Sequence, residues 1–96
     1  MQSEQVSEGW VAVRISLAHF PVGSRDRVWQ EVVKKADRDE LCPALQRVYI
    51  LRRNAEIELE FWFRSCSSDA ARLVVANAVR DAALLVEGAK SKALVS

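Results

Sequence analysis

Three glutamates at alternate positions of one stretch are the side chains best placed for chemistry. Glu56, Glu58 and Glu60 alternate with apolar residues in the segment EIELEFWFR. Alternate residues of a strand project from the same side about 6 to 7 Å apart, so these carboxylates could bind a divalent cation or act as acid and base. The preceding run, LQRVYILRR, offers arginines and a tyrosine as cross-strand partners. We therefore expect a solvated charge ladder here, with no metal ion, no cofactor and no catalytic pair.

His19 is the only histidine and the weak candidate for a general base. Strand parity points it to the core side, at the mouth between the sheet and the first helix. Catalysis there would require a partner such as Asp26 or a cysteine thiol. A lone histidine at a strand end more often packs or faces solvent, so we expect no catalytic residue at this position.

A weak anion-binding candidate lies at the start of the first predicted helix. Ser24 is a suitable helix cap, and Arg25 and Arg27 follow it. Free amides at a helix start and two guanidinium groups favour a bound anion. The simpler interpretation is a capped helix with two solvated arginines.

The two cysteines, Cys42 and Cys66, lie just outside the open end of a predicted hairpin. Strand parity aims Cys42 at the core face and Cys66 at the opposite face, which is unsuitable geometry for a disulfide. We therefore expect two free thiols. With one histidine, the two thiols are too few for a zinc site.

Two strand-like runs between residues 45 and 64 predict that hairpin. A two-residue loop at Asn54 and Ala55 is favoured because asparagine tolerates the left-handed conformation that a primed turn requires. A three-residue loop would turn Val48 and Ile50 towards the glutamates. The two-residue loop predicts the pairs Arg53 with Glu56, Leu51 with Glu58, Ile50 with Leu59, Tyr49 with Glu60, Val48 with Phe61, and Arg47 with Trp62.

The remaining elements follow from periodicity. Alternation predicts a strand over residues 9–18, and helical spacing predicts helices over residues 25–36 and 69–87. Ser67 or Ser68 would cap the second helix, and Gly88 would end it. Residues 93–95 could form a short strand, and residues 1–8 are expected to be a flexible tail.

This order predicts an α+β fold, a two-layer sandwich with an antiparallel sheet and both helices on one face. Insertion of the third strand between the first two gives the ferredoxin-like βαββα(β) topology. Residues 9–96 would form a single domain. The predicted core contains Val11, Val13, Ile15, Leu17, Val48, Ile50, Ile57, Leu59, Phe61 and Phe63, covered by Val28, Val32, Val74, Val75 and Ala78.

Composition limits the classes of partner. The chain has 96 residues, with 14 lysines and arginines against 13 aspartates and glutamates. We therefore expect no nucleic-acid partner from the charge balance, since phosphate contacts usually require a basic excess. No apolar run approaches the about 20 residues that a membrane helix requires, and the amino terminus is polar. We expect a cytoplasmic protein without a membrane partner.

Two surfaces are candidates for protein interaction. They are the sheet face away from the helices and the outer side of the second helix. Together they would expose more apolar area than a monomer normally tolerates, which predicts a homodimer or another stable protein partner. The interface candidates are Trp10, Arg14, Arg47, Tyr49, Leu51, Glu58, Glu60 and Trp62 on the sheet, and Leu73 and Leu84 on the helix.

The leading functional hypothesis is a non-enzymatic interaction or regulatory module that acts as a dimer. The dimer seam is a candidate position for a small ligand. One alternative is a small dimeric enzyme of the α+β-barrel type, with a pocket between sheet and helices and His19 at its mouth. The other is single-stranded RNA binding on the open sheet face, against which the row of glutamates argues.

Overall fold

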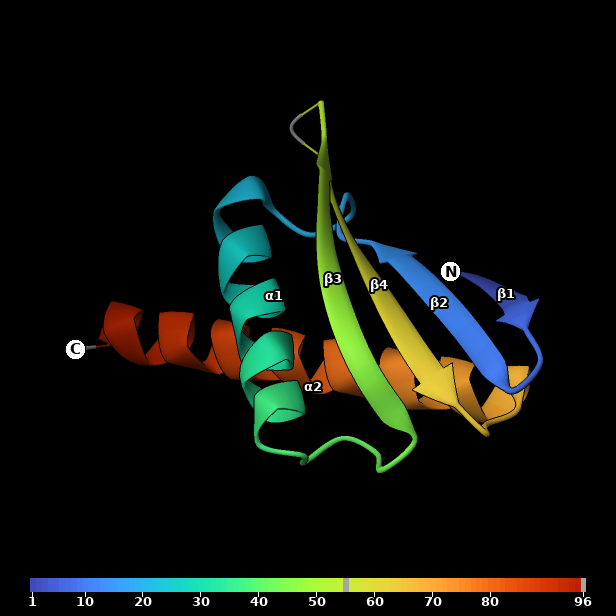
Figure 1. The fold of residues 1–96 in the computed structure, drawn as a ribbon. Helices are drawn as coiled ribbons and strands as arrows, with labels where there is room; N and C mark the ends of the chain where they lie inside the picture. The colour runs from blue at the N-terminus through green and yellow to red at the C-terminus, as the bar shows by residue number, and fades with distance from the viewer. Residues whose placement is uncertain (55, 96) are drawn as a thin grey trace.

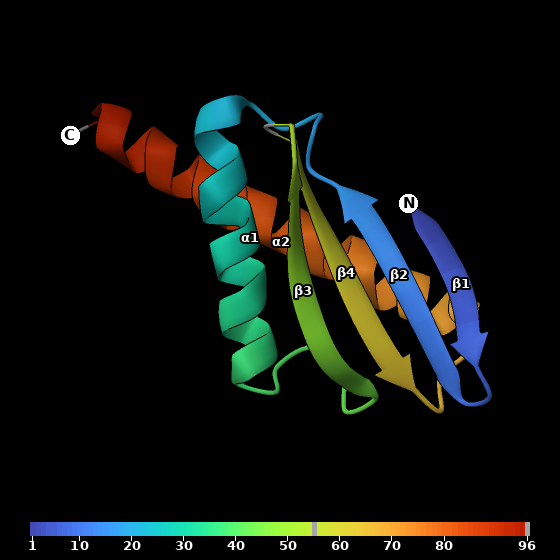
Figure 2. The ribbon, with the colours of Figure 1, turned by 45° about the horizontal axis from the view of Figure 1, so that its top comes forward.

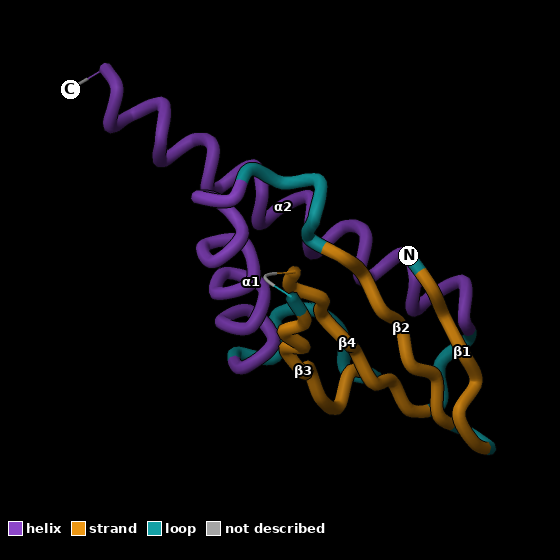
Figure 3. The backbone as a smooth tube through the Cα atoms, turned by 90° about the horizontal axis from the view of Figure 1, so that it is seen from above, coloured by secondary structure: helices purple, strands orange, loops and turns teal. Residues whose placement is uncertain are grey.

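A computed structural model describes residues 1–54 and 56–95, with side chains described up to residue 88 and residue 55 excepted. Its elements are β1 (Gln2–Ser7), β2 (Trp10–Ser16), α1 (Val22–Asp37), β3 (Leu45–Arg53), β4 (Glu56–Arg64) and α2 (Ser68–Val95). The fold is α+β, with a four-stranded antiparallel sheet and two helices (Figure 1). Both helices lie on one side of the sheet, and α2 crosses behind the strands (Figures 2 and 3).

The strand order is β1-β2-β4-β3. The predicted insertion of β4 between β2 and β3 is confirmed. The edge beside β2 differs from the expectation, because it is occupied by β1, formed by residues that we expected to be a flexible tail. The candidate C-terminal strand over residues 93–95 is instead part of α2. The ferredoxin-like order, which needs a C-terminal strand at that edge, is therefore not confirmed.

Chain reversal and backbone pairing explain the formation of β1. Its sequence, QSEQVS, contains one apolar residue and so gives no alternation. Gly9 has φ of 82°, a conformation that glycine adopts at little cost and that allows the tight turn into β2. The β1 backbone then pairs with β2 from Gln2 opposite Arg14 to Ser7 opposite Trp10.

The hairpin register is confirmed for all six predicted pairs, from Arg53 opposite Glu56 to Arg47 opposite Trp62. Asn54 has φ of 49°, the left-handed conformation that the two-residue loop requires. The second loop residue, Ala55, lies outside the described residues. This register turns Val48 and Ile50 towards the core and the glutamates towards the helix-free face.

The core lies between the sheet and the helices, as predicted. Phe61, Phe63, Leu17 and Leu59 are its largest fully buried side chains. Val28 and Val32 of α1 and Val75 and Ala78 of α2 are buried with them, and Ile15, Val48, Ile50 and Val74 are partly buried against them. Helical spacing from Ala71, Val75 and Ala78 also predicts Leu85 on the core side of this helix, but Leu85 is 53% exposed. Val79 and Val86 are buried in its place, so the buried side of α2 is rotated towards those two valines.

Both helices are longer than predicted. α1 begins at Val22 directly after Pro21, so Ser24 lies inside the first turn and does not cap the helix. Ser67 caps α2, because its Oγ accepts a hydrogen bond from the Ala70 amide at 3.2 Å. α2 continues past Gly88, since an interior glycine costs only about 1 kcal/mol and good helix formers follow it. In the described part of the chain, neither helix is long and apolar enough to span a membrane.

Candidate functional site on the open sheet face

The helix-free face of the sheet brings the predicted sheet residues together. In the β2–β4 register, Arg14 is opposite Glu60, and in the β3–β4 register Tyr49 is opposite Glu60 and Leu51 is opposite Glu58. Strand alternation places Trp10 and Trp62 on the same face. The eight sheet residues predicted from the sequence therefore share one surface.

Glu60 is held from two sides at the centre of this face. Arg14 Nε donates to Glu60 Oε2 at 2.7 Å, and Trp62 Nε1 donates to Glu60 Oε1 at 2.7 Å. Glu60 is only 9% exposed. Desolvation raises the pKa of its carboxyl group, but the hydrogen bonds from Trp62 and Arg14 outweigh this effect and hold the pKa below its ordinary value. Glu60 is therefore an ionised structural residue, whose carboxylate is already occupied.

The metal and acid–base chemistry considered for the glutamate row was the alternative to a charge ladder, and the described residues do not bring the three carboxylates together for it. Glu56 lies at the hairpin end of the face and is exposed, whereas Glu60 is bound to Arg14. In the described residues, no group of three or more histidines, cysteines or carboxylates could hold a metal ion. Of the three glutamates, Glu60 forms an ion pair with Arg14, and Glu56 and Glu58 add two further negative charges to the face.

The two tryptophans of this face pack against each other. The Trp10 and Trp62 ring centroids are 6.1 Å apart in an edge-to-face arrangement with planes at 66°. The two rings flank Ala12, which is buried although it lies on the helix-free face. The Arg64 guanidinium lies 5.6 Å from the Trp10 ring centroid, in a cation–π contact. Both tryptophans are partly buried, and they are less exposed than the sequence suggested.

A shallow hollow of about 350 Å³ opens beside these rings, which we call the ring hollow. It is lined by Ser7, Trp10, Arg47, Tyr49 and Trp62. Arg47 Nη1 donates to the Tyr49 hydroxyl at 3.1 Å, which orients the guanidinium along the rim. Ser7 could not be predicted as a lining residue, because it belongs to the strand that was expected to be a tail.

Arg64 was not among the interface candidates, although the strand alternation places it on the same face as Trp62. It is opposite Trp10 in the β2–β4 register. Its contact with the Trp10 ring is what the alternation alone could not show.

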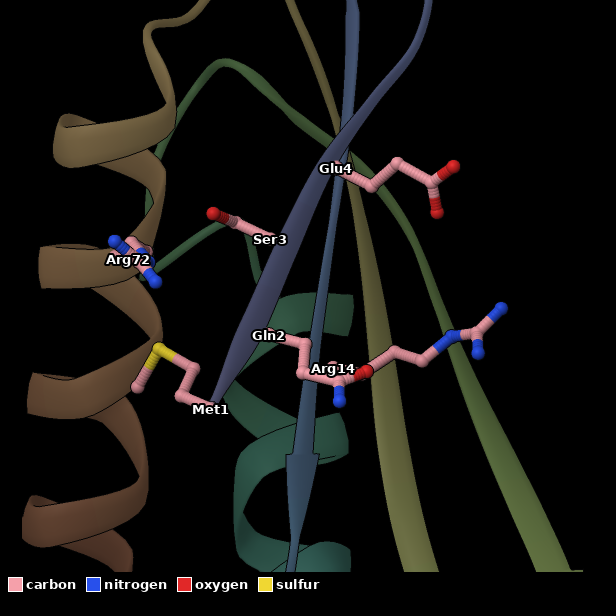
Figure 4. Close-up of a pocket in the computed structure, with 6 residues that line it drawn as sticks. All are labelled: Met1, Gln2, Ser3, Glu4, Arg14 and Arg72. Atoms are coloured by element: carbon pink, nitrogen blue, oxygen red, sulfur yellow. The ribbon is translucent and has the colours of Figure 1, made fainter.

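A second hollow, of about 410 Å³, lies between β1 and α2 (Figure 4). Gln2, Glu4 and Arg14 project to one side of β1, whereas Ser3 projects towards Arg72 on the other side. Its polar groups do not converge on a common point. This hollow is therefore not a candidate site.

His19 lies outside the sheet, away from the position that strand parity predicted. It is exposed in the connection between β2 and α1, and its ring contacts Phe20 at 5.6 Å between centroids. Parity does not extend to it because β2 ends at Ser16. The expected partner, Asp26, accepts a hydrogen bond from Trp29 Nε1 at 3.1 Å instead. The largest fully buried side chains of the core, among them Leu17, Phe61 and Phe63, occupy the space between the sheet and the helices.

The anion-binding candidate at the start of α1 is not assembled either. Arg25 donates from Nε to the Phe20 carbonyl at 2.9 Å and from Nη2 to the Ala18 carbonyl at 2.6 Å. Its guanidinium therefore closes the loop between β2 and α1. Ser24 is buried, and Arg27 is exposed. The three residues do not form a common site, because the helix starts earlier than predicted.

Cys42 and Cys66 are both free thiols. The reason we gave for this was wrong, because both side chains pack against the core and do not leave opposite faces. Burial raises the pKa of the Cys66 thiol, and the charge of Cys42 raises it further. Cys66 is therefore the less reactive type of thiol at neutral pH.

The outer side of α2 carries the second candidate surface. Leu73 is 63% exposed and Leu84 is 61% exposed, as the sequence suggested, and Leu85 lies beside Leu84. The ends of this surface are separated by eleven positions, about three helical turns. These are large apolar side chains that the fold of a single chain leaves in contact with water.

Comparison of the chain with protein-family models, curated proteins and solved structures gave no match. Its function is therefore inferred from the chemistry of its own surfaces. The ring hollow and the outer side of α2 are the two that carry an inference.

Proposed function

We propose that this chain is a non-enzymatic interaction module that acts as a homodimer through the outer side of α2. The exposure of Leu73 and Leu84 on one side of a 28-residue helix carries this proposal. Burial of large apolar side chains is the main favourable contribution to association between subunits.

The α2 surface is self-complementary about a twofold axis. If two copies of α2 pair antiparallel with the axis between Ala78 and Val79, Leu73 of one copy meets Leu84 of the other. The same operation places Asn77 against Arg80 of the second copy, which gives the guanidinium an amide oxygen to bind. Such isologous matching is what a twofold homodimer requires.

The open sheet face is the weaker of the two predicted routes to a dimer. Trp10 and Trp62 already pack against each other, and Glu60 is already paired with Arg14. Among the aromatic residues of that face, Tyr49 has the highest exposure, 40%. The apolar area left for a partner is therefore smaller than on α2, which favours α2.

Sedimentation over a wide concentration range tests this proposal. The wild type should show a monomer–dimer equilibrium, and Leu84→Glu should shift it towards the monomer by placing charge in the contact. Val22→Glu is the matched control, because Val22 is an equally aliphatic, exposed residue at the start of α1. A wild type that stays monomeric, or a dimer that Leu84→Glu leaves intact, would overturn the proposal.

Two finer statements about the chain belong with this proposal. We infer a cytoplasmic location, which two free thiols support because oxidising compartments favour disulfides. We also infer that the fold is a variant of the ferredoxin-like topology. The support is the insertion of β4 between β2 and β3, with β1 at the edge beside β2.

A further inference from the structure

We propose that the ring hollow binds a nucleotide, with the base stacked on the aromatic rings and the phosphate bound by Arg47 or Arg64. This goes beyond the proposed function, since a dimer formed through α2 leaves the helix-free face open. The inference rests on the rings, on the charges around them, and on the pairing of Glu60.

The rings provide a platform for a planar ligand. Trp10, Trp62 and Tyr49 come from three different strands and line one hollow. The Trp62 indole N–H is already bonded to Glu60, so its polar atom is satisfied and its ring remains available for contact. Stacking on aromatic side chains is the common way in which proteins hold an unpaired base.

The arginines provide the charge that a phosphate requires. Arg47 donates to the Tyr49 hydroxyl, and Arg64 lies over Trp10. Among the described residues neither arginine forms a salt bridge, so both positive charges beside the rings are uncompensated. A planar guanidinium binds phosphate oxygens by two parallel hydrogen bonds.

The glutamates that argued against a nucleotide are either paired with an arginine or lie away from the rings. Glu60 is neutralised by Arg14, and Glu56 and Glu58 lie at the hairpin end of the face. Glu4, opposite Ala12 on β1, is a further carboxylate that the strand register places beside the rings. In the part of the face that contains the rings, the strand register thus places three arginines against two glutamates.

The required chemistry, a base with a phosphate, is present both in a free mononucleotide and in a single-stranded nucleic acid. The hollow is shallow and open at the surface, so a strand could lie across it as well as a single nucleotide. Titration with both ligands separates these sources.

The test is a titration monitored by NMR through the indole N–H resonances. Adenosine monophosphate and a single-stranded oligoadenylate are the ligands. Adenosine, which lacks a phosphate, is the control for charge, and inorganic polyphosphate, which lacks a base, is the control for stacking. The Trp10 and Trp62 resonances should shift as ligand is added and reach a plateau when the site is saturated. The Trp29 resonance on α1 is the internal reference and should not shift. Adenosine and polyphosphate should each bind at least about tenfold more weakly than the better nucleotide ligand.

Substitutions locate the contact. Arg47→Gln and Arg64→Gln change exposed side chains, and at least one should weaken nucleotide binding by about three- to tenfold. Arg27→Gln, an exposed arginine on α1, is the matched control and should leave the affinity unchanged. Tyr49→Leu should also weaken binding, because it removes one stacking surface.

The possible results are distinct. Tighter binding of the oligoadenylate identifies a strand as the source, and equal affinity for the mononucleotide identifies a single-nucleotide site. The proposal is overturned if neither nucleotide shifts the Trp10 and Trp62 resonances. It is also overturned if polyphosphate or adenosine binds as tightly as the nucleotides, or if Arg27→Gln weakens binding as much as the rim variants.

Discussion

Arg14 Nε lies 2.7 Å from Glu60 Oε2, in an ion pair between β2 and β4 that joins two residues 46 positions apart in the sequence. The pair removes the central negative charge from the helix-free face. It also anchors the carboxylate to which the Trp62 indole donates. The orientation of the Trp62 ring in the ring hollow therefore depends on the ion pair.

Glu60 should make the stability of the fold depend on acid pH. Its pKa in the folded protein lies below the ordinary glutamate value of about 4.3. Its contribution to the free energy of unfolding is therefore complete above that value and is lost as the pH falls through the folded-state pKa. The Glu60→Gln variant should not show this loss of stability at acid pH. Trp62→Phe removes one hydrogen bond to the carboxylate and should make the loss smaller. Urea unfolding between neutral pH and about pH 3 measures the effect. Identical acid dependence in wild type and Glu60→Gln would contradict it.

Phe61→Ala should destabilise the protein by about 3 to 5 kcal/mol, because Phe61 is fully buried and its removal leaves a cavity. Leu73→Ala is the control on the exposed side of α2 and should change the free energy of unfolding by no more than about 0.5 kcal/mol. Urea denaturation of both variants gives the comparison, at a concentration low enough to keep the chain monomeric. A loss below about 1 kcal/mol for Phe61→Ala would mean that the core face is misassigned.

Antiparallel pairing of α2 predicts a specific cross-link. In a background without Cys42 and Cys66, an equimolar mixture of Leu73→Cys and Leu84→Cys should form a disulfide-bonded heterodimer on mild oxidation. Leu73→Cys alone should not, since two copies of residue 73 would be about 16 Å apart along the helix axis. Non-reducing electrophoresis distinguishes the two results. Efficient cross-linking of Leu73→Cys by itself would indicate a parallel pairing instead.

The Cys66 thiol should react slowly at neutral pH. Both cysteines should be alkylated without prior reduction, and Cys66 should react more slowly in the folded protein than in the protein unfolded in urea, because its raised pKa leaves less thiolate in the fold. Peptide mass spectrometry after timed alkylation measures both rates. A mass two daltons lower with no alkylation would show a disulfide, and equally fast reaction of Cys66 in the folded protein would contradict the effect of burial.

The strands that could be predicted were those with a strong apolar alternation. Phe61 and Phe63 fix the parity of β4, and Asn54 fixes the turn, so the register followed from sequence alone. β1 could not be predicted, because its pairing uses the backbone and its side chains carry no apolar period. The continuation of α2 was missed because Gly88 was treated as a helix end, whereas a single glycine only weakens a helix.

On the open face, the sequence predicted which side chains lie together but not which of them pair. Sequence parity identified which residues share the face, including Tyr49 and Trp62. It could not show that Arg14 neutralises Glu60 while Arg47 and Arg64 form no salt bridge with any described residue, because that depends on which rotamers meet across the strands. The charge pattern of the ring hollow therefore emerged only from the three-dimensional arrangement.

The strand order also dictates a sequence of folding events. β1 with β2 and β3 with β4 are hairpins between chain neighbours, and such hairpins close in about 1 to 10 μs. The β2–β4 pairing instead joins the two hairpins across the intervening α1, so its chain-closure entropy must be overcome before the core forms. Docking of two preformed hairpins is thus the expected slow step. Substitutions along β2–β4 should slow refolding more than substitutions at either turn.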